Sequence, residues 1–268
     1  MAVVITEPRI VLAWLAAARH LEANGREYRN IVLEIERPHE LPAGDRAVLD
    51  QVDAALLAHT DDLSIRTVAT TIFPQALYER LGPDKFADRF LKIMKRGKKA
   101  GTWGTYAMRM LQRRGRAPGS TFNPLEQIIF KLKRASSDGH GYRSNYELGM
   151  HLAEELDETE YEVACELPTY ESAIEGAKVS NIPCLSHLTF KMTKDGRLEL
   201  TAIYRSHYYA ARALGNLVGL SQLLSYVAKE SGLEVGTLTC ISTHAVLDFK
   251  AWGGVTVGKK LLDSLHIA

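Results

Sequence analysis

Residues 184–204, CLSHLTFKMTKDGRLELTAIY, decide the fold. Apolar and polar side chains alternate along 184–192 and again along 198–204, which is the period of a strand with one buried face. The intervening Lys194-Asp195-Gly196 has the composition of a tight turn. The stretch therefore predicts a β-hairpin. Its open end brings Cys184 beside Arg205, because the two residues lie at similar distances from the turn.

Around this hairpin, the sequence predicts both helices and strands. Residues 64–73 are rich in β-branched side chains and end at Pro74, which favours a buried strand with Arg66 exposed. The other predicted strands are 30–36 and 237–242, and the predicted helices are 10–24, 45–59, 83–96, 125–134 and 216–231. We expect an α/β fold with a mixed sheet, in which the hairpin packs on helix 216–231.

Composition indicates a globular protein. The chain has 268 residues, of which 46% are hydrophobic and 24% charged. Its net charge of +1 gives no general attraction to nucleic acid or to an anionic membrane. The longest apolar run near the start, Ile10 to Ala18, is too short to span a bilayer and does not resemble a signal peptide. Three separated cysteines indicate reduced thiols, so we expect a cytoplasmic protein.

Two segments carry charge of one sign. Lys92 to Arg116 contains basic residues and no acid, with Trp103 and Tyr106 interleaved, whereas Leu152 to Gly176 contains acids and no Lys or Arg. Each segment is either a solvated face or a binding surface. The basic segment leaves open an alternative function, a non-catalytic protein that binds RNA or another nucleic acid by charge and stacking. The balanced net charge makes a nucleic-acid partner the weaker expectation.

Cys184 is the best candidate for a nucleophile. A thiol at a strand edge is usually inert, but it becomes reactive when positive charge lowers its pKa in a cleft. Arg205 would supply that charge from the partner strand. Cys165 and Cys240 are typical of core positions, and the sequence shows no zinc-binding spacing and no phosphate-binding glycine loop.

These residues also carry a family resemblance. The series Ile182-Pro183-Cys184, Tyr204-Arg205-Ser206, Asn216 and Thr243-His244 resembles the core of thymidylate synthases, with Asn216 eleven residues after Arg205 as in that family. The resemblance is best over residues 182–244. It implies a single thymidylate-synthase-like domain over 1–268, in which residues 1–60 form a divergent N-terminal α/β segment.

The resemblance implies a role for each matched residue. Cys184 would be the nucleophile, with His244 and Tyr208 as further catalytic residues, and no metal would be needed. The implied substrate-binding residues are Arg205, Ser206, Asn216, Arg143 and Arg66. Arg143 lies in a Gly-Tyr-Arg-Ser stretch that would serve the partner subunit of a homodimer, and Arg66-Thr67 resembles the N-terminal phosphate loop.

The chemistry explains these residue types. A thiolate that adds to carbon 6 of a pyrimidine makes carbon 5 nucleophilic. Arginine binds phosphate and favours the thiolate, and an Asn amide matches the ring N–H and a carbonyl. The resemblance therefore implies transfer of a methyl or hydroxymethyl group from methylenetetrahydrofolate, a folate, to a pyrimidine nucleoside monophosphate.

The sequence departs from the family mainly on the folate side. Tyr208 stands where the family has a folate-contacting Asp, Leu185 replaces a His, Thr189 replaces a Gln, and Arg212 begins the run before Asn216. The sequence leaves open uracil or cytosine as the base, ribose or deoxyribose as the sugar, and methyl or hydroxymethyl as the transferred group.

Overall fold

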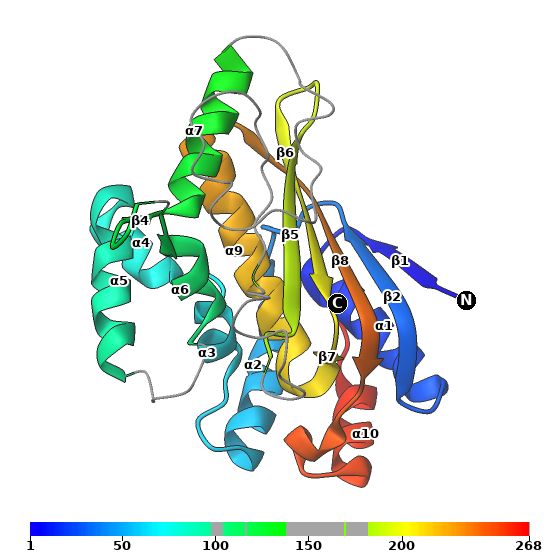
Figure 1. The fold of residues 1–268 in the computed structure, drawn as a ribbon. Helices are drawn as coiled ribbons and strands as arrows, with labels where there is room; N and C mark the ends of the chain where they lie inside the picture. The colour runs from blue at the N-terminus through cyan, green and yellow to red at the C-terminus, as the bar shows by residue number, and fades with distance from the viewer. Residues whose placement is uncertain (98–103, 116, 138–168, 170–181, 268) are drawn as a thin grey trace.

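The computed structural model describes residues 1–97, 104–115, 117–137, 169 and 182–267 (Figure 1). The main-sheet strands are β1 (Val3–Glu7), β2 (Glu27–Ile35), β5 (Leu185–Met192), β6 (Arg197–Tyr204), β7 (His207–Tyr208) and β8 (Glu234–Val246). The helices are α1 (Ile10–Ala23), α2 (Ala43–His59), α3 (Ile65–Thr70), α4 (Gln75–Leu81), α5 (Pro83–Gly97), α6 (Tyr106–Leu111), α7 (Pro124–Ser137), α9 (Leu214–Ser231) and α10 (Val255–Ser264). Shorter elements are the β3–β4 pair (Arg113–Arg114 and Thr121–Phe122), the π-helix η2 (Tyr209–Ala213) and the 3-10 helix η3 (Phe249–Trp252).

The main sheet is mixed, as the sequence predicts. Its order is β1-β2-β8-β6-β5, with β7 paired to β8. The β1–β2 and β8–β6 pairs are parallel, and the β2–β8 and β6–β5 pairs are antiparallel. Because β2 pairs directly with β8, the N-terminal segment and the segment with the family resemblance share one sheet. The protein therefore has an α/β fold, and the helices predicted at 10–24, 45–59, 83–96, 125–134 and 216–231 are confirmed as α1, α2, α5, α7 and α9.

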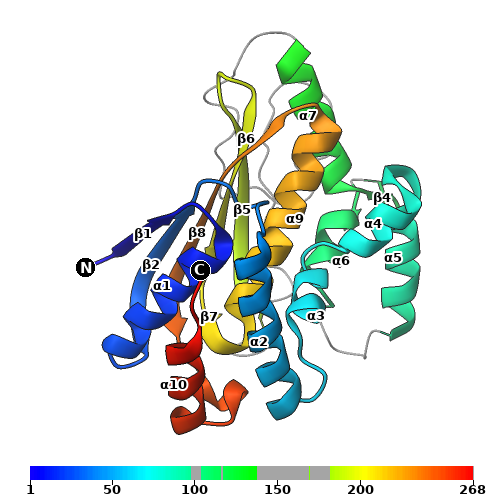
Figure 2. The same ribbon diagram turned by 180° about the vertical axis from the view of Figure 1, so that it is seen from behind.

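One face of the sheet carries the core. Helices α1, α2 and α9 lie on this face, which Figure 2 shows in front of the strands. The β5–β6 hairpin buries its even-numbered apolar residues here, namely Leu188, Phe190, Leu198, Leu200 and Ala202. Among the apolar residues Leu188, Phe190, Leu198, Leu200 and Ile203 of the hairpin, Ile203 points to the opposite face.

The strand predicted at 64–73 is wrong, because this segment forms α3. The Ser64 side chain accepts a hydrogen bond from Thr67 N–H, and the Thr67 hydroxyl accepts one from Ser64 N–H. Two reciprocal bonds of this kind satisfy free N–H groups of the first turn and start a helix despite β-branched residues. Tertiary packing also favours the helix, because α3 packs closely on α9 at Gly215. A Cβ added at Gly215 would lie 2.7 Å from Val68 Cβ.

Candidate active site

The hairpin register brings Cys184 and Arg205 together at one end of the sheet. Cys184 directly precedes β5 and Arg205 directly follows β6, and the Arg205 N–H donates a hydrogen bond of 2.9 Å to the Cys184 carbonyl. This confirms the predicted open end of the hairpin. Ser206 and β7 follow, and β7 pairs with β8, so Cys184, Arg205, Ser206 and His207 come from strand ends of one sheet.

Tyr106 fixes the backbone at Cys184. Its hydroxyl accepts hydrogen bonds from Cys184 N–H at 3.1 Å and from Leu185 N–H at 3.2 Å. Tyr106 is buried, and burial raises the pKa of its hydroxyl to about 12, so the group stays neutral at physiological pH. The sequence did not indicate this role, and instead suggested Tyr106 as a stacking residue for nucleic acid. Burial of the ring excludes that stacking.

Burial and positive charge act in opposite directions on Cys184. Burial raises the pKa of the thiol and is the larger effect, while the charges of Arg205 and Arg212 lower it. The expectation that Arg205 would depress this pKa is therefore right in direction, but burial outweighs it. Arg212 was not among the predicted site residues. It is exposed and lies in η2, the π-helix directly before α9.

Asn216 belongs to a buried hydrogen-bonded chain. Its Nδ2 lies 3.1 Å from Nε2 of His207, and Nδ1 of His207 lies 2.9 Å from the Ser242 hydroxyl. The Ser242 hydroxyl is in turn 3.2 Å from the Tyr209 hydroxyl. All four side chains are buried. The sequence marked Asn216 but gave no sign that His207 contacts it, because the two residues meet only through the fold.

The other predicted residues are distributed around this end. Tyr208 is exposed at the end of β7, and Ser206 is half-buried beside Arg205. His244 lies on β8 at the level of Arg29, and its Nε2 is 2.9 Å from Glu27 Oε1 on β2. His244 thus contacts β2, on the side of β8 opposite to β6.

The two remaining predicted phosphate ligands are placed differently. Arg66 is exposed on the first turn of α3, a helix that contacts α9 at Gly215, next to Asn216. Arg143 lies outside the described residues, as do Cys165 and Trp103. Cys240 is fully buried on β8, and burial raises the pKa of its thiol to about 12.

Comparison with known proteins finds similar curated proteins, although no family model matches the chain. A curated protein of Methanosarcina acetivorans named "Putative thymidylate synthase" is 34% identical over 142 residues, which is 48% of this chain and 65% of that protein. The protein of the same name from Methanosarcina mazei is 37% identical over the same shares of the two chains. A third, from Methanothermobacter thermautotrophicus, is 44% identical over 64 residues, 24% of this chain and 28% of that protein.

The chain is similar to these archaeal proteins named "Putative thymidylate synthase". It matches somewhat less than two thirds of the length of the first relatives. None of the described residues forms a cluster of His, Cys, Asp and Glu able to hold a metal ion. Within the described segments, the helices are too short or too polar to cross a membrane.

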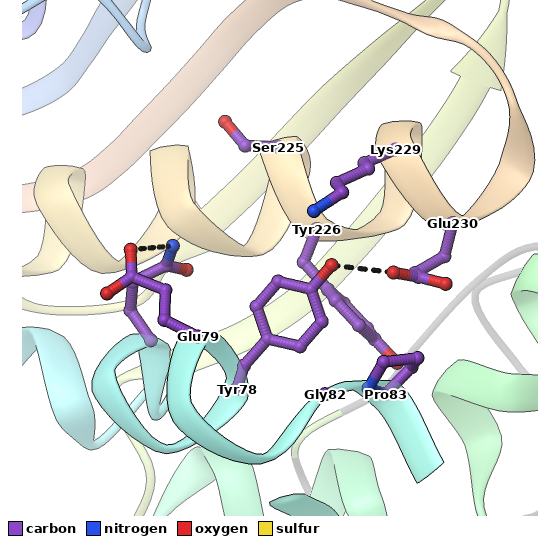
Figure 3. Close-up of a pocket in the computed structure, with 9 residues that line it drawn as sticks. Tyr78, Glu79, Gly82, Pro83, Ser225, Tyr226, Lys229 and Glu230 are labelled. Atoms are coloured by element: carbon purple, nitrogen blue, oxygen red, sulfur yellow. Dashed lines mark hydrogen bonds between the residues drawn. The ribbon is translucent and has the colours of Figure 1, made fainter.

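A cavity of about 530 Å³ lies elsewhere in the protein, between α4 and the C-terminal half of α9 (Figure 3). Lys229, on its wall, lies about 20 Å along α9 from Asn216 at the helical rise per residue. The Tyr78 hydroxyl donates a 2.6 Å hydrogen bond to Glu230, and the Gln75 amide donates one of 2.8 Å to Glu79. Two pairs of side chains on its wall therefore bond to each other, and neither Cys184 nor Arg205 is among the residues that line it.

Proposed function

We propose that this protein transfers a one-carbon unit to carbon 5 of a pyrimidine nucleoside monophosphate through a covalent adduct at Cys184. The observation that carries the proposal is the pairing of Cys184 with Arg205 at the open end of the hairpin, where the backbone bond of 2.9 Å joins them. The charge of Arg205 also acts on the Cys184 thiol, so the thiol could attack a pyrimidine whose phosphate the guanidinium holds. The family relatives support the same chemistry.

In the proposed reaction, the Cys184 sulfur adds to carbon 6 of the pyrimidine and makes carbon 5 a nucleophile. Methylenetetrahydrofolate supplies the one-carbon unit to carbon 5. Loss of the proton on carbon 5 would then break the bond from the methylene carbon to the folate nitrogen and leave an exocyclic methylene on the ring. This methylene would take a hydride from the released tetrahydrofolate, which gives a methyl group and dihydrofolate, or hydroxide from water, which gives a hydroxymethyl group and tetrahydrofolate. The electron pair returned to the ring would expel the Cys184 thiolate and restore the double bond between carbons 5 and 6. His244 and Tyr208 are the proposed proton-transfer or ribose-binding groups.

The substrate would be bound by charge and by an amide. Arg205 and Ser206 would hold the phosphate, assisted by Arg66 and by Arg143, and charge-assisted bonds of this kind are the strong ones in proteins. Asn216 would contact the base edge. An exposed Tyr208 ring and an exposed Arg212 fit a flat pterin with an acidic tail, which supports a folate as co-substrate. Whether the product carries a methyl or a hydroxymethyl group depends on that co-substrate's environment.

The protein is proposed to act as a homodimer through the sheet face that α9 does not cover. A row of neighbouring side chains crosses all five long strands on this face, namely Val4, Val32, Ile241, Ile203 and His187. Four of them are aliphatic, and a second copy would remove them from water. Sedimentation at micromolar concentration should give twice the chain mass, and a monomer would contradict this part of the proposal.

A mechanism-based trap tests the reaction. The protein is incubated with 5-fluorodeoxyuridylate and methylenetetrahydrofolate, because fluorine at carbon 5 cannot leave as a proton and the adduct accumulates. Mass spectrometry of the peptides should find the nucleotide and the one-carbon unit on Cys184. The same nucleotide without folate is the control. An adduct on another residue, or none with uracil or cytosine nucleotides, would refute the proposal.

A further inference from the structure

The π-helix η2 is capped by a residue from another element. Within the described residues, the side chain of its N-cap residue Tyr208 forms no capping hydrogen bond, and the first N–H groups of a helix have no partner inside the helix. The Asp248 carboxylate supplies the missing acceptor. Its Oδ1 accepts hydrogen bonds from Ala210 N–H at 3.0 Å and from Ala211 N–H at 3.3 Å. Because both donors are backbone amides, these two bonds have a fixed direction.

The backbone around Asp248 is itself held in place. β7 pairs with the end of β8, so η2 and the residues after β8 start side by side. The N–H of Leu247 donates a hydrogen bond of 2.8 Å to the carbonyl of Arg26. Leu247 and Phe249, on either side of Asp248, have buried side chains. The carboxylate of Asp248 is therefore presented to η2 from a well-fixed position.

A second contact anchors η2 from α1. The indole N–H of Trp14, a fully buried residue, donates a hydrogen bond of 2.9 Å to the carbonyl of Tyr209. π-helical turns are rare and are frequent at functional sites. Here the turn is bonded on one side to Trp14 and on the other to Asp248. The place of η2 thus depends on these contacts as well as on its own hydrogen bonds.

Arg212 is the residue of η2 that reaches the candidate site. It follows the two capped amides directly in the chain, and its charge lowers the pKa of both Cys184 and Asp248. Among the described residues, Arg205 and Arg212 are those whose charges act on the Cys184 thiol. Asp248 can therefore influence Cys184 through Arg212, but not by its own charge.

We infer that Asp248 is a positioning residue, which caps η2 and so holds Arg212 within reach of Cys184. This inference rests on the proposed function, in which the Cys184 thiol is the reacting group. The cap needs an oxygen acceptor more than it needs a negative charge, because backbone N–H groups also bond to a neutral carbonyl. An amide at this position should therefore suffice. A side chain without oxygen leaves two N–H groups unpaired and lets η2 shift.

The test is the pH profile of thiol alkylation in the full chain. Rates of iodoacetamide reaction, followed by peptide mapping, give the pKa of Cys184 in each variant. Asp248→Ala removes the acceptor, Asp248→Asn keeps an oxygen without the charge, and Arg212→Ala removes the charge that acts on the thiol. Asp263→Ala is the matched control, since Asp263 is an exposed carboxylate on α10. The double variant of Asp248→Ala and Arg212→Ala completes a cycle that measures the coupling.

We expect Asp248→Ala to raise the pKa of Cys184 and to slow alkylation at neutral pH about threefold, the size expected for one exposed charge. Asp248→Asn and Asp263→Ala should match wild type. The double variant should react as slowly as Arg212→Ala alone, because Asp248 acts through Arg212. An unchanged rate in Asp248→Ala, equal slowing in Asp248→Asn, or further slowing in the double variant would overturn the inference.

Two further measurements keep the inference testable if Asp248→Ala does not fold. Asp248→Leu has nearly the same shape without an acceptor and takes the place of the alanine variant. In wild type, hydrogen exchange should show protected amides at Ala210 and Ala211, and fast exchange of both would overturn the cap. None of these measurements needs a nucleotide. A wild type that shows the expected alkylation profiles but no fluoropyrimidine adduct would refute the proposed function and not the cap.

Discussion

The two ends of α9 differ in how they use polar groups. At the N-terminal end, Asn216 belongs to a buried hydrogen-bonded chain, and the neighbouring turn brings Arg212 toward Cys184. At the C-terminal end, a cavity of about 530 Å³ is lined by pairs such as Tyr78 and Glu230 that bond to each other. This cavity is therefore not where a nucleophile and cations converge. Convergence of reactive groups, more than volume, locates the candidate site.

The largest expected effect is at Cys184. Cys184→Ser should keep the fold, because the residue is only half-buried and the two side chains have nearly the same size, but should abolish the fluoropyrimidine adduct. A serine hydroxyl without a strong base is a poor nucleophile toward an electron-poor ring. Mass spectrometry of the trapped protein measures this.

Cys240→Ser is the matched control and should retain the adduct, since that thiol is fully buried. In peptide mapping after iodoacetamide treatment, Cys184 should label before Cys240, and a pyrimidine monophosphate should protect it. If Cys240 or Cys165 were labelled before Cys184, Cys184 would not be the most reactive thiol.

Substitutions of Arg205 and Lys229 compare the roles of cations near the two ends of α9. Arg205→Ala should weaken deoxyuridylate binding by about 1.5–3 kcal/mol, because it removes a charge-assisted contact to phosphate. It should also raise the pKa of Cys184 further and slow alkylation at fixed pH. Lys229→Ala should leave the nucleotide affinity as it is. Calorimetric titration measures both, and equal losses in the two variants would remove the distinction between the ends.

His207 predicts an acid-sensitive stability at the N-terminal end. Its pKa of about 3 in the folded state lies below the ordinary 6.5, so between these values only the unfolded chain takes up the proton. This group's contribution to the free energy of unfolding should therefore fall as the pH drops, by about 1.4 kcal/mol per pH unit.

Urea unfolding of wild type and His207→Phe at pH 4 to 7 measures this difference. In His207→Phe, the free energy of unfolding should lack the pH dependence that His207 contributes. Asp248, whose pKa is raised to about 6 by burial, contributes the opposite slope below pH 6, but it does so in both proteins. Parallel pH profiles would contradict the neutral, buried state of His207.

The smallest expected effect is at the cavity. Tyr78→Phe removes the 2.6 Å hydrogen bond to the half-buried Glu230 and should lower the free energy of unfolding by about 1 kcal/mol, because water can replace the lost partner. Nucleotide affinity should not change. Thermal unfolding and titration measure the two quantities, and a loss of affinity would connect the cavity to the site near Cys184.

Local sequence pattern was enough to predict much of the fold. Alternation of apolar and polar residues predicted the hairpin strands, and helical spacing predicted α9. Gly196 predicted the turn, where it has a positive φ of 81°. The pairing of Cys184 with Arg205 also follows, because antiparallel strands joined by a short turn have a fixed register. Segment 64–73 was misassigned, since β-branched composition was weighed without the Ser64–Thr67 cap and the α9 surface.

The sequence by itself determined the strand and helix periods, the position of Cys184 at a hairpin end and the family resemblance that led to Asn216. Only the tertiary structure decided that His207 bonds to Asn216, that Tyr106 holds the Cys184 backbone and that Arg212 acts on its thiol. These residues come from separate elements. Their meeting depends on how α6, β7, η2 and α9 pack at the end of the sheet, and hydrogen bonds across such distances leave no periodic pattern in the sequence.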